Sequence, residues 1–149
     1  MESKEIIDYC EKNLPEVSIV ESGEKQAFSI ILKINSKEGY ISLPSKKKDG
    51  DNDKASNLDR SDIYRLNIGV GRNTFLKHFA EIPARPSKGG VIDMDCDFTQ
   101  KGVLMPHPVY GWMSWVCILN PTIEYFNSSL KELIDEAYEL ARQKAKKRK

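Results

Sequence analysis

Residues 63–69 predict a strand whose polar face carries groups that could bind a ligand. Arg65 and Asn67 alternate with Leu66 and Ile68, and alternate side chains of a strand point to opposite faces. We therefore expect the guanidinium and the amide to lie together, away from the apolar face. Groups of these two types can bind an anion or the polar edge of a ring.

A second group of such side chains lies in residues 105–115 (MPHPVYGWMSW), where two prolines stiffen the connection between two expected strands. An antiparallel neighbour could bring this segment beside residues 63–69, with the polar tips of His107 and Tyr110 at the rim of a pocket. The resulting candidate site for a small anionic or aromatic ligand comprises Arg65, Asn67, His107, Tyr110 and Trp112. A purely structural interpretation stays open, in which Arg65 pairs with a carboxylate and His107 bonds a backbone carbonyl.

Residue types for catalysis or metal binding are present but not in a convincing arrangement. Cys96 or Cys117 with His107 could form a nucleophile and base, although no third residue to orient the base can be identified. No Cys or His pair has zinc-site spacing, and the acidic runs at 49–53 and 93–97 lack the glycine and glutamate of a calcium loop. The sequence therefore predicts no metal and no cofactor.

Residues 69–74 (GVGRNT) follow a strand and begin a helix, as a dinucleotide-binding fingerprint would. Thr74 stands where the third glycine belongs, so the match fails. Free N–H groups of the helix beside Arg72 could still hold an anion, and a plain strand-to-helix turn is the alternative.

Composition and length are those of one globular domain, residues 1–149, with 40% hydrophobic and 30% charged side chains. No apolar stretch is long enough for a membrane helix, and the N-terminal residues do not resemble a secretory signal. Three widely spaced cysteines do not suggest a disulfide framework. These features favour a cytoplasmic protein that makes no membrane contact.

Charge is distributed unevenly along the chain. Six of the positive charges lie in a basic tail, residues 142–149, so the rest of the chain carries −5 against a total of +1. A mildly acidic body does not suggest a broad nucleic-acid-binding face. The tail could still contact phosphates without reading sequence, through Lys144, Lys146, Lys147, Arg148 and Lys149.

The hydrophobic pattern predicts an α+β fold in the order α-β-β-β-α-β-β-α, with helices packed on a five-stranded antiparallel sheet. Helices are expected near residues 4–12, 74–79 and 129–141, with Ser129 and Glu132 as a capping box. Strands are expected near residues 26–34, 40–43, 63–69, 103–105 and 112–119. The polar residues 45–59 predict a mobile loop.

Residues 56–75, 97–99, 104–121 and 130–141 resemble a bacterial family described as domain of unknown function 6194. That resemblance implies no activity and no site residue. The order of elements, and a Trp-bearing strand before the last helix, also resemble the MmcQ/YjbR-like proteins, which implies a fold like that of type III secretion chaperones. The His-Trp-Asn signature of those proteins would fall on residues 114–116, where only Trp115 matches.

These features favour a non-catalytic binding or interaction domain. A nucleic-acid-associated protein, by analogy with the YjbR-like proteins, is the second hypothesis. A small enzyme that uses His107 is the third, because no nucleophile and base could be placed together from spacing alone.

Overall fold

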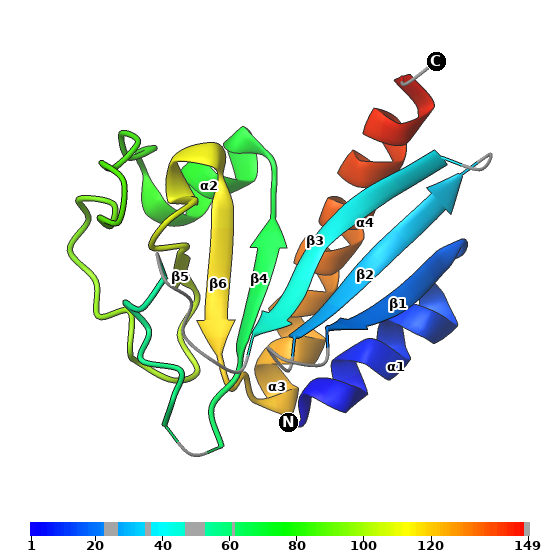
Figure 1. Ribbon diagram of the computed structural model, residues 1–149, viewed down its shortest axis with the longest axis horizontal. Helices are drawn as coiled ribbons and strands as arrows, with labels where there is room; N and C mark the ends of the chain where they lie inside the picture. The colour runs from blue at the N-terminus through cyan, green and yellow to red at the C-terminus, as the bar shows by residue number, and fades with distance from the viewer. Residues whose placement is uncertain (23–26, 35–36, 47–52, 61, 148–149) are drawn as a thin grey trace.

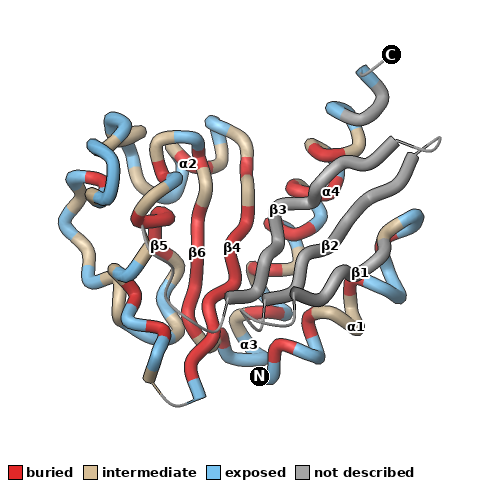
Figure 2. Tube along the Cα trace, in the orientation of Figure 1, coloured by how far each residue is buried: buried red, intermediate tan, exposed pale blue. Residues whose placement is uncertain are grey.

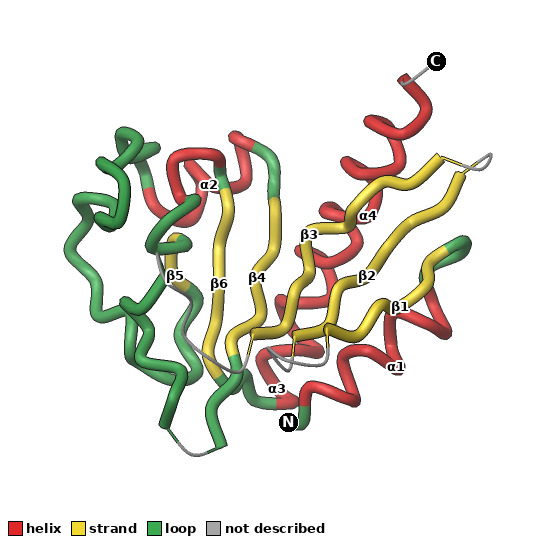
Figure 3. The backbone as a smooth tube through the Cα atoms, viewed as in Figure 1, coloured by secondary structure: helices red, strands yellow, loops and turns green. Residues whose placement is uncertain are grey.

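The computed structural model contains one antiparallel sheet. Helices cover one face of the sheet, and loops cover part of the other (Figures 1 and 3). The structure describes residues 1–22, 27–34, 37–46, 53–60 and 62–147. Within these, only the backbone is described for residues 18–22, 27–34, 37–46, 145 and 146.

The sheet has six strands in the order β1-β2-β3-β4-β6-β5, and each neighbouring pair is antiparallel. The strands are β1 Val17–Ser22, β2 Ala27–Ile34, β3 Lys37–Lys46, β4 Arg65–Gly69, β5 Met105–Pro106 and β6 Trp115–Leu119. The α+β class is therefore as predicted, but the five-stranded sheet is wrong. The prediction missed β1, a short segment whose pairing with β2 depends on a partner strand as well as on its own pattern.

The helices are α1 Ser3–Asn13, α2 Arg72–Phe79, the short α3 Ile123–Tyr125 and α4 Lys131–Lys147. A π-helical turn, Phe126–Leu130, joins α3 to α4. The helix that includes α4 therefore begins earlier than the capping box at Ser129 predicted. Its cap is Thr122, whose hydroxyl accepts the backbone N–H of Tyr125 at 3.1 Å.

The main core lies between the sheet and the helices. β4 and β6 contribute alternate residues to it, and α1, α2 and α4 cover these residues with apolar faces (Figure 2). Leu66 and Ile68 pair with Ile118 and Val116 across the two strands, so four apolar side chains form one continuous surface under α4. Helices on one face of an antiparallel sheet were expected, and this arrangement confirms it.

A smaller core lies on the opposite face of β4 and β6, under loops. It comprises Leu58, Ile63, Met105, Cys117 and Leu119, with Phe98 against it. The antiparallel register sets Asn67 opposite Cys117, so Cys117 lies on the polar side of β4. The loops therefore cover a mixed polar and apolar surface.

Part of the predicted mobile loop, residues 45–59, has a defined structure. Ser45 and Lys46 end β3 and pair with β4. Residues 53–59 lie against the sheet, with Ser56 and Leu58 fully buried. Residues 47–52 lie outside the described part of the chain.

Packing under α4 gives a direct test of this fold. Ile134 is fully buried in the main core, so Ile134→Ala should lower the free energy of unfolding by about 2–5 kcal/mol. Glu139→Ala, on the exposed side of the same helix, should change it by less than about 0.5 kcal/mol. Urea denaturation of both variants measures the difference, and equal stabilities would contradict the assigned helix face.

Candidate functional site

Strand β4 turns Arg65 and Asn67 toward the loops, as the alternation predicted. Arg65 is fully buried and Asn67 is 3% exposed. A guanidinium cannot lose its charge inside a protein, so its burial requires several hydrogen-bond partners. The structure supplies them from three separate segments of the chain.

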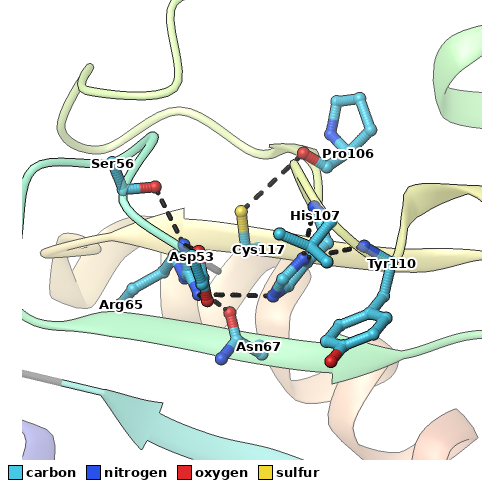
Figure 4. A network of polar contacts seen from close by, with 9 residues as sticks. Asp53, Ser56, Arg65, Asn67, Pro106, His107, Tyr110 and Cys117 are labelled. Carbon is cyan, nitrogen blue, oxygen red and sulfur yellow. Dashed lines mark hydrogen bonds and ion pairs between the residues drawn. The ribbon is translucent and has the colours of Figure 1, made fainter. Parts of the chain in front are cut away.

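Arg65 is the centre of the buried polar network shown in Figure 4. Its Nε donates to Asn67 Oδ1 at 2.8 Å, and its Nη1 donates to Asp53 Oδ1 and to Ser56 Oγ, each at 3.0 Å. Nη2 forms an ion pair with Asp53 Oδ2 and lies 3.3 Å from His107 Nε2. The guanidinium therefore binds a carboxylate with two nitrogens, in the bidentate geometry that gives strong charge-assisted hydrogen bonds.

His107 follows β5 and points into the same network. The residue is 2% exposed, and its Nδ1 accepts the backbone N–H groups of Val109 and Tyr110, each at 3.1 Å. Its backbone N–H donates to Trp115 O at 2.9 Å. Both ring nitrogens therefore have protein neighbours within hydrogen-bonding distance, and the histidine fixes the turn that follows it.

Two aromatic rings flank His107. The centroid of Tyr110 lies 5.1 Å from the imidazole and that of Trp115 lies 6.2 Å away, and the two aromatic rings are 5.9 Å apart. Trp112 is not part of this group, because it lies in the 3-10 turn Gly111–Met113 with the guanidinium of Arg85 4.8 Å from its ring.

Of the five predicted ligand residues, the structure brings Arg65, Asn67, His107 and Tyr110 together. Only Tyr110 is well exposed, at 46%. Sequence reasoning missed Trp115, Ser56 and Asp53. For Trp115 the available signal was its place on the same strand face as Cys117, whereas the two loop residues carry no periodic signal.

The cysteines near this network are not activated nucleophiles. Cys117 Sγ donates to Pro106 O at 3.9 Å, and burial raises the pKa of the Cys117 thiol to about 12. Burial, followed by the carboxylates of Asp95 and Asp97, raises the pKa of Cys96. Both thiols therefore stay protonated at neutral pH, and a thiol is a much weaker nucleophile than a thiolate.

At the N-terminus of α2, where an anion was one alternative to a plain turn, the structure places the protein's own carboxylate. Glu136 of α4 accepts the backbone N–H of Gly71 at 3.1 Å and the hydroxyl of Thr74. A carboxylate is favoured at a helix N-terminus, because the N–H groups there are unpaired. Residues 69–74 thus form a strand-to-helix turn that α4 holds in place.

Two pockets lie beside the sheet, one at β5 and the other at the residues directly before β4. The Phe79 pocket encloses about 380 Å³ between α2, β5 and the loop before β5. Its apolar lining consists of Phe79, Met94, Val103, Leu104, Met105 and Pro106. Its other lining residues are Asp95, Cys96, Asp97 and Gln100.

The second pocket, the Tyr64 pocket, encloses about 890 Å³ and is lined by residues 1–3, 58–60, 62–64 and Asn120. Its lining mixes the charges of Glu2, Asp59, Arg60 and Asp62. Neither pocket is lined by Arg65, Asn67 or His107.

Among the described residues, no group of three or more His, Cys, Asp or Glu side chains has the arrangement of a metal site. In the same part of the chain, no helix is long and apolar enough to cross a bilayer.

The family model for the "Family of unknown function (DUF6194)" matches residues 1–149. This confirms the predicted resemblance to domain of unknown function 6194. The resemblance to the MmcQ/YjbR-like proteins stays a prediction. No curated protein and no solved structure matches this chain.

The buried network predicts a large effect from removing its cation. Arg65→Met leaves the Asp53 carboxylate without its guanidinium and should lower the free energy of unfolding by about 3–5 kcal/mol. Arg142→Met removes an exposed ion pair with Glu139 and should cost less than about 1 kcal/mol. Denaturant titration compares the two, and a similarly small loss for Arg65→Met would show that the network does not hold the loops.

Proposed function

We propose that this protein, which belongs to the DUF6194 family, is a non-catalytic domain that binds a small ligand with an apolar body in the Phe79 pocket. The observation that carries the proposal is the pocket itself. Six of its ten lining residues are apolar, and its volume falls within the range of about 300–1,000 Å³ that ligand sites occupy.

The state of the reactive side chains supports a role in binding rather than catalysis. A general base needs a ring nitrogen within reach of a substrate proton, and His107 has both nitrogens against protein atoms. A thiol nucleophile needs a lowered pKa, and the pKa of Cys117 is raised. The positive charge of Arg65 is paired with Asp53, so it attracts an outside anion weakly.

The network has a supporting role in this proposal. Met105 lines the pocket and pairs with Cys117 in the sheet, and Cys117 in turn lies opposite Asn67. His107 fixes the turn directly after Pro106, another lining residue. Buried polar contacts therefore fix the pocket wall that β5 forms. A fixed wall lowers the entropy cost of binding, because fewer protein groups must become ordered around the ligand.

An exposed valine at the pocket allows a test that leaves the fold intact. Val103 is 42% exposed and lines the Phe79 pocket, so Val103→Trp should block the pocket with little loss of stability. Val91→Trp is a matched control, because Val91 is 47% exposed and does not line the pocket.

The measurement is a fragment screen of the full chain by thermal shift and NMR. Hits should raise the melting temperature of the unaltered protein and of Val91→Trp but not of Val103→Trp, since only a bound ligand stabilises the folded state. The proposal would be refuted if Val103→Trp still binds the hits. It would also be refuted if no apolar fragment binds the unaltered protein.

A nucleic-acid-associated role remains a second proposal, because the end of α4 extends past the sheet (Figure 1). The buried stripe of α4 ends at Ala141, and beyond it Lys144 and Lys147 are exposed. Exposed cations on a projecting helix end can approach phosphates without displacing protein contacts.

Deleting residues 145–149 tests this second role. The melting temperature should change little, because the deleted residues follow the last buried position of α4. Affinity for duplex DNA at low salt should fall by about tenfold or more, since each lost phosphate contact weakens salt-dependent binding. If the intact protein shows no salt-dependent DNA binding, the nucleic-acid role is wrong.

A further inference from the structure

We infer that the ligand of the Phe79 pocket is a small aromatic amine that carries a positive charge. This inference rests on the proposed function and adds the chemical class of the ligand. The sequence suggested an anionic or aromatic ligand at Arg65, whereas the inferred ligand is aromatic, carries a positive charge and binds at a different site.

The charge follows from the residues around the pocket. Asp95 and Asp97 both line it, and none of its described lining residues is basic. The charge of Arg60 acts on Asp97, but its guanidinium donates to the backbone oxygens of Ser56, Asn57 and Thr99 and does not line the pocket. An ammonium group at the mouth would therefore meet carboxylates without competition from a protein cation in the lining.

Asp97 is held in its charged form by its own loop. Its Oδ1 accepts the backbone N–H of Thr99 at 3.0 Å and the Thr99 hydroxyl at 2.6 Å. These two hydrogen bonds lower the pKa of Asp97, and the charge of Arg60 adds to the effect. Asp95 and Asp97 lie on either side of Cys96 in the chain, and all three residues line the pocket.

The aromatic body follows from the apolar wall. Met94 and Met105 line the pocket with Phe79, and thioether sulfurs make favourable contacts with aromatic rings. Methionine side chains also adapt to the shape of a flat ring better than branched ones do. A ring of ordinary size with a short amine chain would place its apolar part on this wall and its charge beside Asp95.

Three probes of nearly equal shape separate charge from apolar contact: 2-phenylethylamine, 2-phenylethanol and 3-phenylpropionate. Titration of the full chain by NMR at low ionic strength should give the lowest Kd for the amine, by about threefold or more over the alcohol, because a favourable ion pair adds to the same apolar contact. The carboxylate should bind most weakly.

Asp95→Asn should reduce the preference of the amine over the alcohol, because only the Asp97 carboxylate then remains, while leaving the affinity for the alcohol unchanged. Asp93→Asn is the matched control, since it makes the same charge change on the same exposed loop at a residue that does not line the pocket. This control should keep the preference. Asp97 is left intact because its carboxylate shapes the loop through Thr99.

The outcomes distinguish this inference from the proposed function. If the alcohol or the carboxylate binds as well as the amine, and Val103→Trp abolishes that binding, the pocket binds ligands but the charge assignment is wrong. Equal effects of Asp95→Asn and Asp93→Asn would also refute the assignment. Absence of binding by the amine up to about 10 mM would refute the inference as a whole.

Discussion

The arrangement of the loops that cover one face of β4 and β6 depends on the buried ion pair between Arg65 and Asp53. Arg65 is fully buried, and removing a charge from water costs several kcal/mol unless other groups replace the lost hydration. Asp53 supplies the opposite charge at Nη1 and Nη2, and Asn67 accepts from Nε. Ser56 also accepts from Nη1, and His107 lies beside Nη2. One side chain therefore joins β4, the segment that precedes it and the turn after β5.

The contact of Arg65 with His107 helps to explain how the two-residue strand β5 can form the edge of the sheet. β5 has two residue pairs with β6, which is a short ladder for a segment that also carries two prolines nearby. Its stability comes from contacts on either side: Met105 packs in the smaller core, and His107 accepts two backbone N–H groups in the turn. The pocket beside β5 thus has a fixed wall even though the strand itself is minimal.

The sequence was sufficient to predict the local pattern of the site but not its partners. Alternation along β4 placed Arg65 and Asn67 on one face, and the prolines marked the turn that brings His107 to them. The faces of β6 depend on register with β4, and register is a long-range property, so local periodicity did not show that Cys117 lies on the same side as Asn67. Trp112 was expected beside His107, but it lies in the 3-10 turn Gly111–Met113, and Trp115 lies beside His107 in its place.

The loop that supplies Asp53 shows why polar segments are difficult to interpret from sequence. Its composition offers too little apolar surface to offset the entropy of ordering, so mobility was the reasonable expectation. What composition does not reveal is a buried cation elsewhere in the chain that requires a carboxylate. Arg65 stands in a strand 12 residues after Asp53, and nothing in the local pattern links the two.

The two faces of the sheet therefore meet different physical demands. The helix side buries apolar residues against α1, α2 and α4, so close packing is its main source of stability. The loop side uses directional hydrogen bonds, because loops offer few apolar side chains and must still be held at defined positions. His107 fixes the turn after β5, next to the Phe79 pocket, by accepting two backbone N–H groups. The pocket wall at β5 therefore depends on hydrogen bonds, whereas Phe79 of α2, on the other wall, packs against the main core.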